Sequence, residues 1–144
     1  MKLAIHGRPI KEDAIPYIQA MFDCFLKHKL DILIHQPFKT ILEKKGIKNC
    51  NYPTYSKKYD LQNVDFMISA GGVGTLLEAV TYLGNKCISI LGINTGRLGF
   101  LATTAREDIS KAIDELVAGE YKIKERSLIS LIDGEHYFGG VNFG

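Results

Sequence analysis

The chain has 144 residues, of which 46% are hydrophobic and 24% charged, and its formal net charge is +2. This length and composition are typical of a globular domain with its own core. The even balance of charges argues against nucleic acid or an anionic membrane as a partner, and no apolar run approaches the length of a membrane span. Cys24, Cys50 and Cys87 are widely spaced and form no CxxC pair, which indicates reduced thiols in a cytoplasmic protein.

The first part of the chain alternates short apolar runs with amphipathic stretches. Residues 2–6 and 31–35 are β-type runs and predict two strands. The stretch between them has apolar residues at helical spacing, and Asp13 can cap that helix. A second helix is predicted to end at Gly46. The polar residues 49–60 then predict an exposed, mobile connection.

The middle of the chain repeats this alternation. Residues 64–70 are apolar on both faces, as expected of a buried parallel strand. They are followed by the run GGVGT, a helix over residues 76–83 and a further strand over residues 87–94. Thr104 and Glu107 have the spacing of a capping box and predict the start of the clearest helix in the chain.

The order of these elements predicts the fold class. Strands and helices that alternate through short connections indicate an α/β domain with an open, mainly parallel sheet and flanking helices, over residues 1–119. Gly119 provides the stop of the last helix. The pattern then changes to two strand-like runs around a hairpin turn at Asp133-Gly134. We interpret residues 120–144 as the first strands of a truncated, β-rich second domain.

Three glycine-containing connections follow predicted strands and are candidates for a ligand site. They are Gly7-Arg8-Pro9, Gly71 to Thr75, and residues 92–102. In an open α/β sheet such connections meet at the carboxyl ends of the strands, where backbone N–H groups, an arginine or a hydroxyl can bind phosphate and sugar. No GxxxxGK[ST] is present, and GxGxxG fails because Leu77 stands at the third glycine position. A tight strand-to-helix turn without any ligand remains the alternative.

The histidines give no metal signal in the sequence. His6, His28, His35 and His136 show neither HExxH nor any other zinc-ligand spacing. The sequence therefore predicts no metal site.

Two stretches of the chain resemble a known pair of signatures. DFMISAGGVGTLLEAV and ILGINTGRLGFLATT are similar to the GGDGT and G-I-N-x-G-x-L-G-F-L motifs of NAD kinases. The resemblance covers essentially the whole chain, including the segment GEYKIKERSLI. The first motif alone is shared with diacylglycerol and sphingosine kinases and has a relative in 6-phosphofructokinases, whereas the second resembles NAD kinases only. The resemblance implies a Rossmann-like NAD kinase N-terminal domain.

The resemblance also implies an activity and a set of site residues. Members of the family transfer the γ-phosphoryl group of ATP, or of polyphosphate in some members, to the 2′-hydroxyl of the adenosine ribose of NAD, giving NADP. Mg²⁺ or another divalent metal accompanies ATP, and a homo-oligomer, dimer or tetramer, is expected at full length. Leu77 and Leu101 are equally well explained as core side chains. By position, the residues expected to bind the nucleotides are Gly71, Gly72, Gly74, Thr75, Leu77, Arg97, Phe100 and Leu101.

The sequence departs from the family pattern at two places. Val73 stands where the family has the aspartate of GGDGT, and valine can neither accept nor donate a proton. A carboxylate there would orient the ribose hydroxyl and take its proton, an effect worth roughly 10²–10⁴-fold in rate. The chain also ends at Gly144, before the Asn-Glu or Asn-Asp pair of the family. We therefore expect no activity from the chain as it stands, with a non-catalytic dinucleotide-binding module as one alternative and a lipid-kinase-like domain as another. The valine itself could be engineered, natural or an error.

Overall fold

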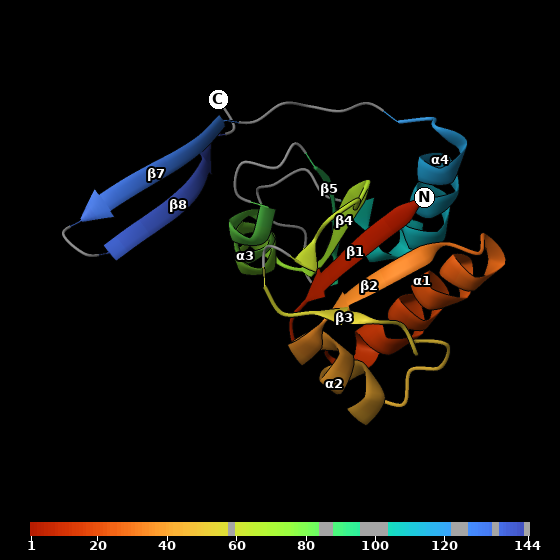
Figure 1. Ribbon diagram of the computed structural model, residues 1–144. Coiled ribbons are helices and arrows are strands. Elements are labelled where there is room, and N and C mark those ends of the chain that lie inside the picture. The colour runs from red at the N-terminus through yellow and green to blue at the C-terminus, as the bar shows by residue number, and fades with distance from the viewer. Residues whose placement is uncertain (58–59, 84–87, 96–103, 122–126, 134–135, 143–144) are drawn as a thin grey trace.

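A computed structural model describes residues 1–57, 60–83, 88–95, 104–121, 127–133 and 136–142 of the chain. Its main body is one six-stranded parallel sheet with the strand order β3-β2-β1-β4-β5-β6 (Figure 1). This confirms the predicted open, parallel α/β fold. The strands are β1 (Lys2–Gly7), β2 (Asp31–His35), β3 (Thr54–Tyr55), β4 (Phe66–Gly71), β5 (Ser89–Asn94) and β6 (Thr104–Ala105).

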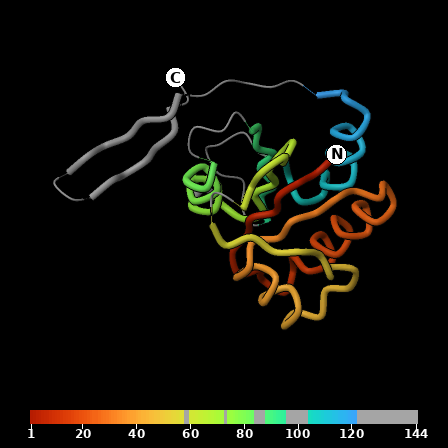
Figure 2. Tube along the Cα trace, viewed as in Figure 1, coloured from red at the N-terminus to blue at the C-terminus, as the bar shows by residue number. Residues whose placement is uncertain are grey.

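The helices cover both faces of this sheet. From the centre, the chain runs outward through β2 to β3, then returns to β4 and runs outward the other way to β6 (Figure 2). Because strand–helix–strand crossovers are right-handed, these two directions place their helices on opposite faces. The first face carries the helices α1, α2 and α4, whereas α3 covers the second (Figure 1). Their bounds are α1 (Ile15–Lys27), α2 (Gln36–Lys44), α3 (Val73–Leu83) and α4 (Ile109–Ala118).

The core follows the alternation of side chains along the central strand β1. Leu3 and Ile5 are fully buried beneath α1, α2 and α4, and Ala4 lies on the other face with the residues of α3. Gly7 ends the strand directly under the ring of Phe38 in α2. A Cβ at Gly7 would lie 2.6 Å from that ring, so glycine is what lets α2 pack there.

The two predicted helix caps are wrong. Asp13 lies in a 3₁₀ turn, η1 (Glu12–Ala14), and its carboxylate accepts a hydrogen bond from Arg106 Nη1 at 3.1 Å. Thr104 belongs to β6 and Glu107 to a second 3₁₀ turn, η3 (Arg106–Asp108). Neither α1 nor α4 has a side-chain cap. A 3₁₀ turn precedes each of these helices. The polar residue of each predicted cap therefore lies before or within that turn, ahead of the first helical residue.

Two other boundaries differ from the prediction. Residues 49–60 are not only an exposed connection, because they contain the strand β3, in which Tyr55 is almost completely buried. The helix expected over residues 76–83 begins at Val73, so that the end of GGVGT forms its first turn. The helix stop at Gly119 is confirmed by its left-handed φ of +77°.

The chain beyond α4 forms a second, separate sheet. Strands β7 (Ser127–Asp133) and β8 (His136–Asn142) pair antiparallel, with Asp133 opposite His136. This confirms the predicted hairpin, although Gly134 itself lies outside the described residues. The boundary between two domains at residue 119 stays a prediction. Within the part of the chain that the structure describes, no helix is both long and apolar enough to cross a membrane.

Candidate functional site

The strand order of the main sheet reverses between β1 and β4. After β1 the chain continues into a helix on one face of the sheet, and after β4 into a helix on the other face. In open α/β sheets, ligands bind outside the carboxyl ends of two strands that diverge in this way. Gly7 is paired in register with Ala70, so the ends of both strands are level. Thr95, after β5, donates its N–H to Gly71 O at 3.4 Å. The three predicted connections therefore begin side by side, although residues 96–102 lie outside the described residues.

Gly71 is required by the turn from β4 into α3. Its φ is +156°, and a Cβ built on it would lie 2.8 Å from Cβ of Thr75. Any larger residue would have to displace Thr75, whose side chain is itself buried. The geometry of the turn is thus sufficient to explain this glycine without a ligand.

Gly72 and Gly74 are different, because the described part of the fold makes no demand for glycine at either position. Neither has a φ in the left-handed region, and outside the turn itself no atom of a described residue lies within 4 Å of a Cβ built there. Glycine also weakens a helix relative to alanine, and Gly74 lies in the first turn of α3. That turn therefore presents bare backbone at the carboxyl edge of the sheet.

The first turn of α3 also has the electrostatics of an anion site. Leu76 donates the first helical N–H to Gly72 O at 3.2 Å. The N–H groups before it have no partner within the helix and carry the positive end of the helix dipole. A phosphate that approached the bare backbone would meet these donors.

Of the remaining predicted site residues, the structure describes only those in α3. Val73 is the first residue of α3, and Thr75 is buried in the first turn of this helix. Leu77 follows in the same helix and is half-buried. Arg97, Phe100 and Leu101 lie outside the described residues. Contact of these residues with a nucleotide stays a prediction.

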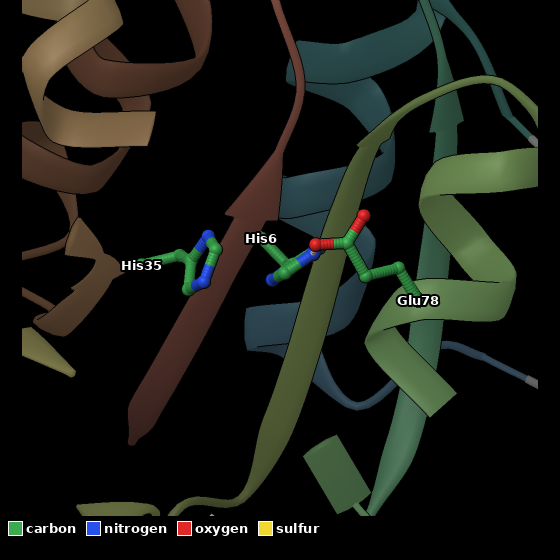
Figure 3. A group of neighbouring side chains, drawn as sticks. All are labelled: His6, His35 and Glu78. Carbon is green, nitrogen blue, oxygen red and sulfur yellow. Dashed lines mark ion pairs between the residues drawn. The ribbon is translucent and has the colours of Figure 1, made fainter. Parts of the chain in front are cut away.

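A buried polar cluster lies beside this turn, on the face of the sheet that α3 covers. It consists of His6 near the end of β1, His35 at the end of β2 and Glu78 in α3 (Figure 3). His6 is fully buried and His35 is 5% exposed. His6 Nε2 lies 3.2 Å from Glu78 Oε1, and the other carboxylate oxygen, Oε2, accepts a hydrogen bond from Arg8 Nη2.

Two tyrosines occupy the other nitrogen of each imidazole. His6 Nδ1 lies 3.2 Å from the hydroxyl of Tyr55, and His35 Nε2 lies 2.9 Å from that of Tyr82. His35 Nδ1 is then buried without a hydrogen-bond partner among the described residues, whereas the equally buried His6 Nε2 faces the Glu78 carboxylate at 3.2 Å. Buried polar atoms are rarely left without a partner, so His35 Nδ1 in particular calls for an explanation.

Burial sets the charges of the cluster. Burial, and then the neighbouring His35, lower the pKa of His6 to about 4, and burial also lowers the pKa of His35. Partial burial would raise the pKa of Glu78, but the hydrogen bond from Arg8 and the charge of His6 outweigh it and lower this pKa. At neutral pH the cluster therefore combines two neutral imidazoles with an ionised carboxylate.

The cluster was missed in the sequence because its members come from three separate elements. Spacing rules for metal sites describe ligands that lie close along the chain. The signal that was present is a histidine at or near the end of each of two predicted neighbouring strands. Arg8, which belongs to one of the three predicted ligand connections, is paired with Glu78.

Comparison with known proteins gives a consistent result. The family model described as "ATP-NAD kinase N-terminal domain" matches residues 3–121. The chain is 47% identical over 144 residues to an NAD kinase of Cytophaga hutchinsonii, covering 99% of this chain and 49% of the relative. It is 38% identical over 133 residues to an NAD kinase of Flavobacterium psychrophilum, covering 91% and 45% respectively. The chain thus spans about half the length of the curated relatives that it matches.

A solved structure has the same fold. It is that of yeast NADH kinase complexed with NADH, which is similar with a TM-score of 0.71 over 98% of this chain and 45% of that one. The sequences are only 18% identical, so this likeness concerns the arrangement of strands and helices.

Proposed function

Because the chain belongs to the NAD kinase family, we propose that it forms the dinucleotide-binding half of a phosphotransferase. The reaction proposed is transfer of the γ-phosphoryl group of ATP to the 2′-hydroxyl of the adenosine ribose of NAD, giving NADP. The observation that carries the proposal is the bare first turn of α3 at the reversal of strand order, where Gly72 and Gly74 serve no need of the described fold. A dinucleotide supplies the missing reason for these glycines, since its phosphates can then approach the backbone N–H groups.

The proposed roles of the chain's residues are binding and positioning. The backbone of Gly72 and Gly74 holds phosphate, and Arg97, Phe100 and Leu101 of the family motif contribute from the connection after β5. Mg²⁺ would neutralise charge on the phosphate oxygens of ATP, by which it is mainly held. Glu78 offers it no ligand toward the first turn of α3, because one of its oxygens pairs with Arg8 and the other faces His6.

The first test is binding of NAD to the full chain of 144 residues, measured by calorimetry. Gly74→Ala should weaken NAD binding by about tenfold or more, because a methyl group then occupies the space where ligand and backbone meet. The same substitution should leave the free energy of unfolding unchanged or raise it by up to about 1 kcal/mol, because alanine favours the helix. Ser110→Ala, in the first turn of α4, is the matched control and should bind NAD normally. Unaltered NAD binding by Gly74→Ala would contradict the proposal.

The second test concerns the residue at position 73. Valine supplies no proton acceptor, so a protein of the relatives' full length that carries Val73 should form little NADP. Val73→Asp should raise kcat by roughly 10²-fold or more, with a much smaller change in the KM for NAD, because a general base acts mainly in the transition state.

Val73→Asn is the control for this second test, since it has the shape of aspartate without its basicity. Equal turnover by the Asp and Asn variants in steady-state kinetics would show that position 73 does not hold the base. The phosphoryl transfer would then depend on positioning and electrostatics alone.

A second candidate function is a dinucleotide-binding module without catalysis, which Val73 favours. It predicts NAD binding in the first test and no gain from Val73→Asp in the second. We further propose a homo-oligomer and a cytoplasmic location, as the family resemblance suggests. The buried, free thiols of Cys24 and Cys50 support a reducing compartment.

A further inference from the structure

The cluster of His6, His35 and Glu78 has the composition of a metal centre. One nitrogen from each imidazole and one carboxylate oxygen lie within 4.8 Å of one another, and Figure 3 shows the three side chains converging from β1, β2 and α3. Tetrahedral zinc has ligands about 2.0–2.1 Å away, which places neighbouring ligand atoms roughly 3.3 Å apart. The 3.2 Å between His6 Nε2 and Glu78 Oε1 is close to that separation, and the wider separations in the cluster, up to 4.8 Å, would shorten on binding.

The hydrogen bonds around the cluster engage one nitrogen of each imidazole and leave the other available as a metal ligand. In metal sites the second nitrogen of a histidine ligand is held by an outer partner, which fixes the ring and its tautomer. Here Tyr55 and Tyr82 occupy one nitrogen of each ring, and the atoms left over, His6 Nε2 and His35 Nδ1, are both buried. Each imidazole is thus oriented by a tyrosine. Its other nitrogen has no partner among the described residues in the case of His35 Nδ1, and faces only Glu78 in the case of His6 Nε2.

The carboxylate has an outer partner as well. Arg8 binds Oε2 of Glu78 and leaves Oε1 directed at His6. The Glu78 side chain is 31% exposed, so of the three it has the most room to adjust toward a bound ion. Glu78 would carry the negative charge of the site, while the neutral imidazoles provide lone pairs.

We propose that His6, His35 and Glu78 bind a divalent transition-metal cation of the zinc type, with a fourth position open to water. Two imidazoles and one carboxylate suit Zn²⁺ and its neighbours, whereas Mg²⁺ and Ca²⁺ prefer oxygen ligands alone. The ion would join β1, β2 and α3, and so fix the helix whose first turn is the proposed phosphate site. The inference does not depend on the proposed function, because it rests on these side chains alone.

The direct experiment titrates Zn²⁺ into the full chain, free of any affinity tag and treated with a chelator beforehand. Long-range ¹H–¹⁵N spectra of the histidine side chains report each imidazole nitrogen without any substitution. One equivalent of Zn²⁺ should shift the resonances of His6 and His35 and leave those of His28 unchanged. Saturating Zn²⁺ that leaves His6 and His35 unshifted would overturn the proposal and leave a buried histidine pair without a metal.

Substitution of the partly exposed ligand gives an independent test. Glu78→Gln should weaken Zn²⁺ binding by at least about tenfold, since even outer partners of metal ligands are worth 10- to 100-fold in affinity. The control is Glu115→Gln, which removes a helical carboxylate of similar exposure that is paired with Lys111 in α4. Equal Zn²⁺ affinity of Glu78→Gln and the parent chain, measured by competition with a chromophoric chelator, would also overturn the proposal.

Discussion

Glycine has two different roles within the few residues that join β4 to α3. Gly71 is demanded by the turn, because its φ and its contact with Thr75 exclude a side chain. Gly72 and Gly74 have no such constraint from the described residues, and helix stability alone would favour another residue at position 74. The motif in the sequence treats these glycines alike, whereas the structure separates the one that makes the turn from the two that leave space beside it.

At the same scale, the burial of His6 makes a prediction about pH. The pKa of His6 is about 4 in the folded chain, against about 6.5 when it is exposed in the unfolded chain. Between these values the unfolded chain binds a proton that the folded chain does not, so stability rises with pH. For the metal-free chain in the presence of a chelator, the free energy of unfolding should fall as the pH decreases from 6.5 toward 4. The contribution of His6 to this fall is at most about 1.4 kcal/mol per pH unit.

Two measurements check this expectation. Urea unfolding at several pH values gives the free energies, and NMR titration of the His6 ring reports its protonation directly. His6→Asn removes the titrating group, so this part of the pH dependence should disappear even though the variant is less stable overall. A His6 resonance that titrates near pH 6.5 in the folded chain would be incompatible with the burial described here.

At the scale of elements, α1 buries one face against the sheet and leaves the other exposed. Phe25 is fully buried and meets Phe22 edge-on, with ring centroids 5.3 Å apart, whereas the adjacent Leu26 is 57% exposed. Phe25→Ala should therefore lower the free energy of unfolding by about 3–5 kcal/mol. Leu26→Ala should change it by less than about 0.5 kcal/mol. Urea unfolding of both variants provides the test, and similar losses would mean that the helix packs with a different face inward.

Which boundaries the sequence could predict depends on how local their causes are. The strand over residues 31–35 is confirmed without change, because its apolar run and flanking residues lie within the segment itself. The caps of α1 and α4 were wrong because each helix is entered through a 3₁₀ turn, and the two turns are joined by the ion pair of Arg106 with Asp13. Arg106 donates to Asp13 and to Thr95 O, and its guanidinium stacks over Tyr17 at 4.9 Å. No local motif reveals that these two helix entrances share one arginine.

The same reasoning applies to the candidate sites. The connection from β4 to α3 was found from the sequence because its three glycines lie within four consecutive residues. The cluster around His6 depends on which strands are neighbours and in what register, and on a helix that crosses above them. Periodicity predicts that such strands exist, but their pairing is a property of the assembled sheet.

At the scale of the whole molecule, two halves of the chain meet where β1 pairs with β4. The first half is β1 to β3 and the second β4 to α4, and they also meet through α1 and α4. There His28 Nε2 lies 2.6 Å from Asp114 Oδ1, and Arg106 reaches Asp13. One backbone connection, between β3 and β4, joins the halves covalently.

Fragments cut within that connection should therefore associate when they are produced together. Co-purification and a native-like circular dichroism spectrum would report the association. Ile68 is fully buried and lies opposite Ile5 in the pairing of β1 with β4, so Ile68→Asp should abolish it. Lys44→Asp, on the exposed side of α2, is the control and should have no effect. Fragments that purify separately would show that the two halves associate only when the chain between β3 and β4 is continuous.

The shortness of the outermost strands limits the addition of a strand from another chain to the main sheet. Within the part of the chain that the structure describes, β3 and β6 each contain two residues, so these two strands themselves offer another chain almost no backbone with which to continue the ladder. Long, unprotected edges are the usual starting points of sheet-to-sheet aggregation. Among the described residues, addition of a strand along β3 or β6 is therefore disfavoured, and we expect two copies that associate to do so through helices, loops or the hairpin of β7 and β8.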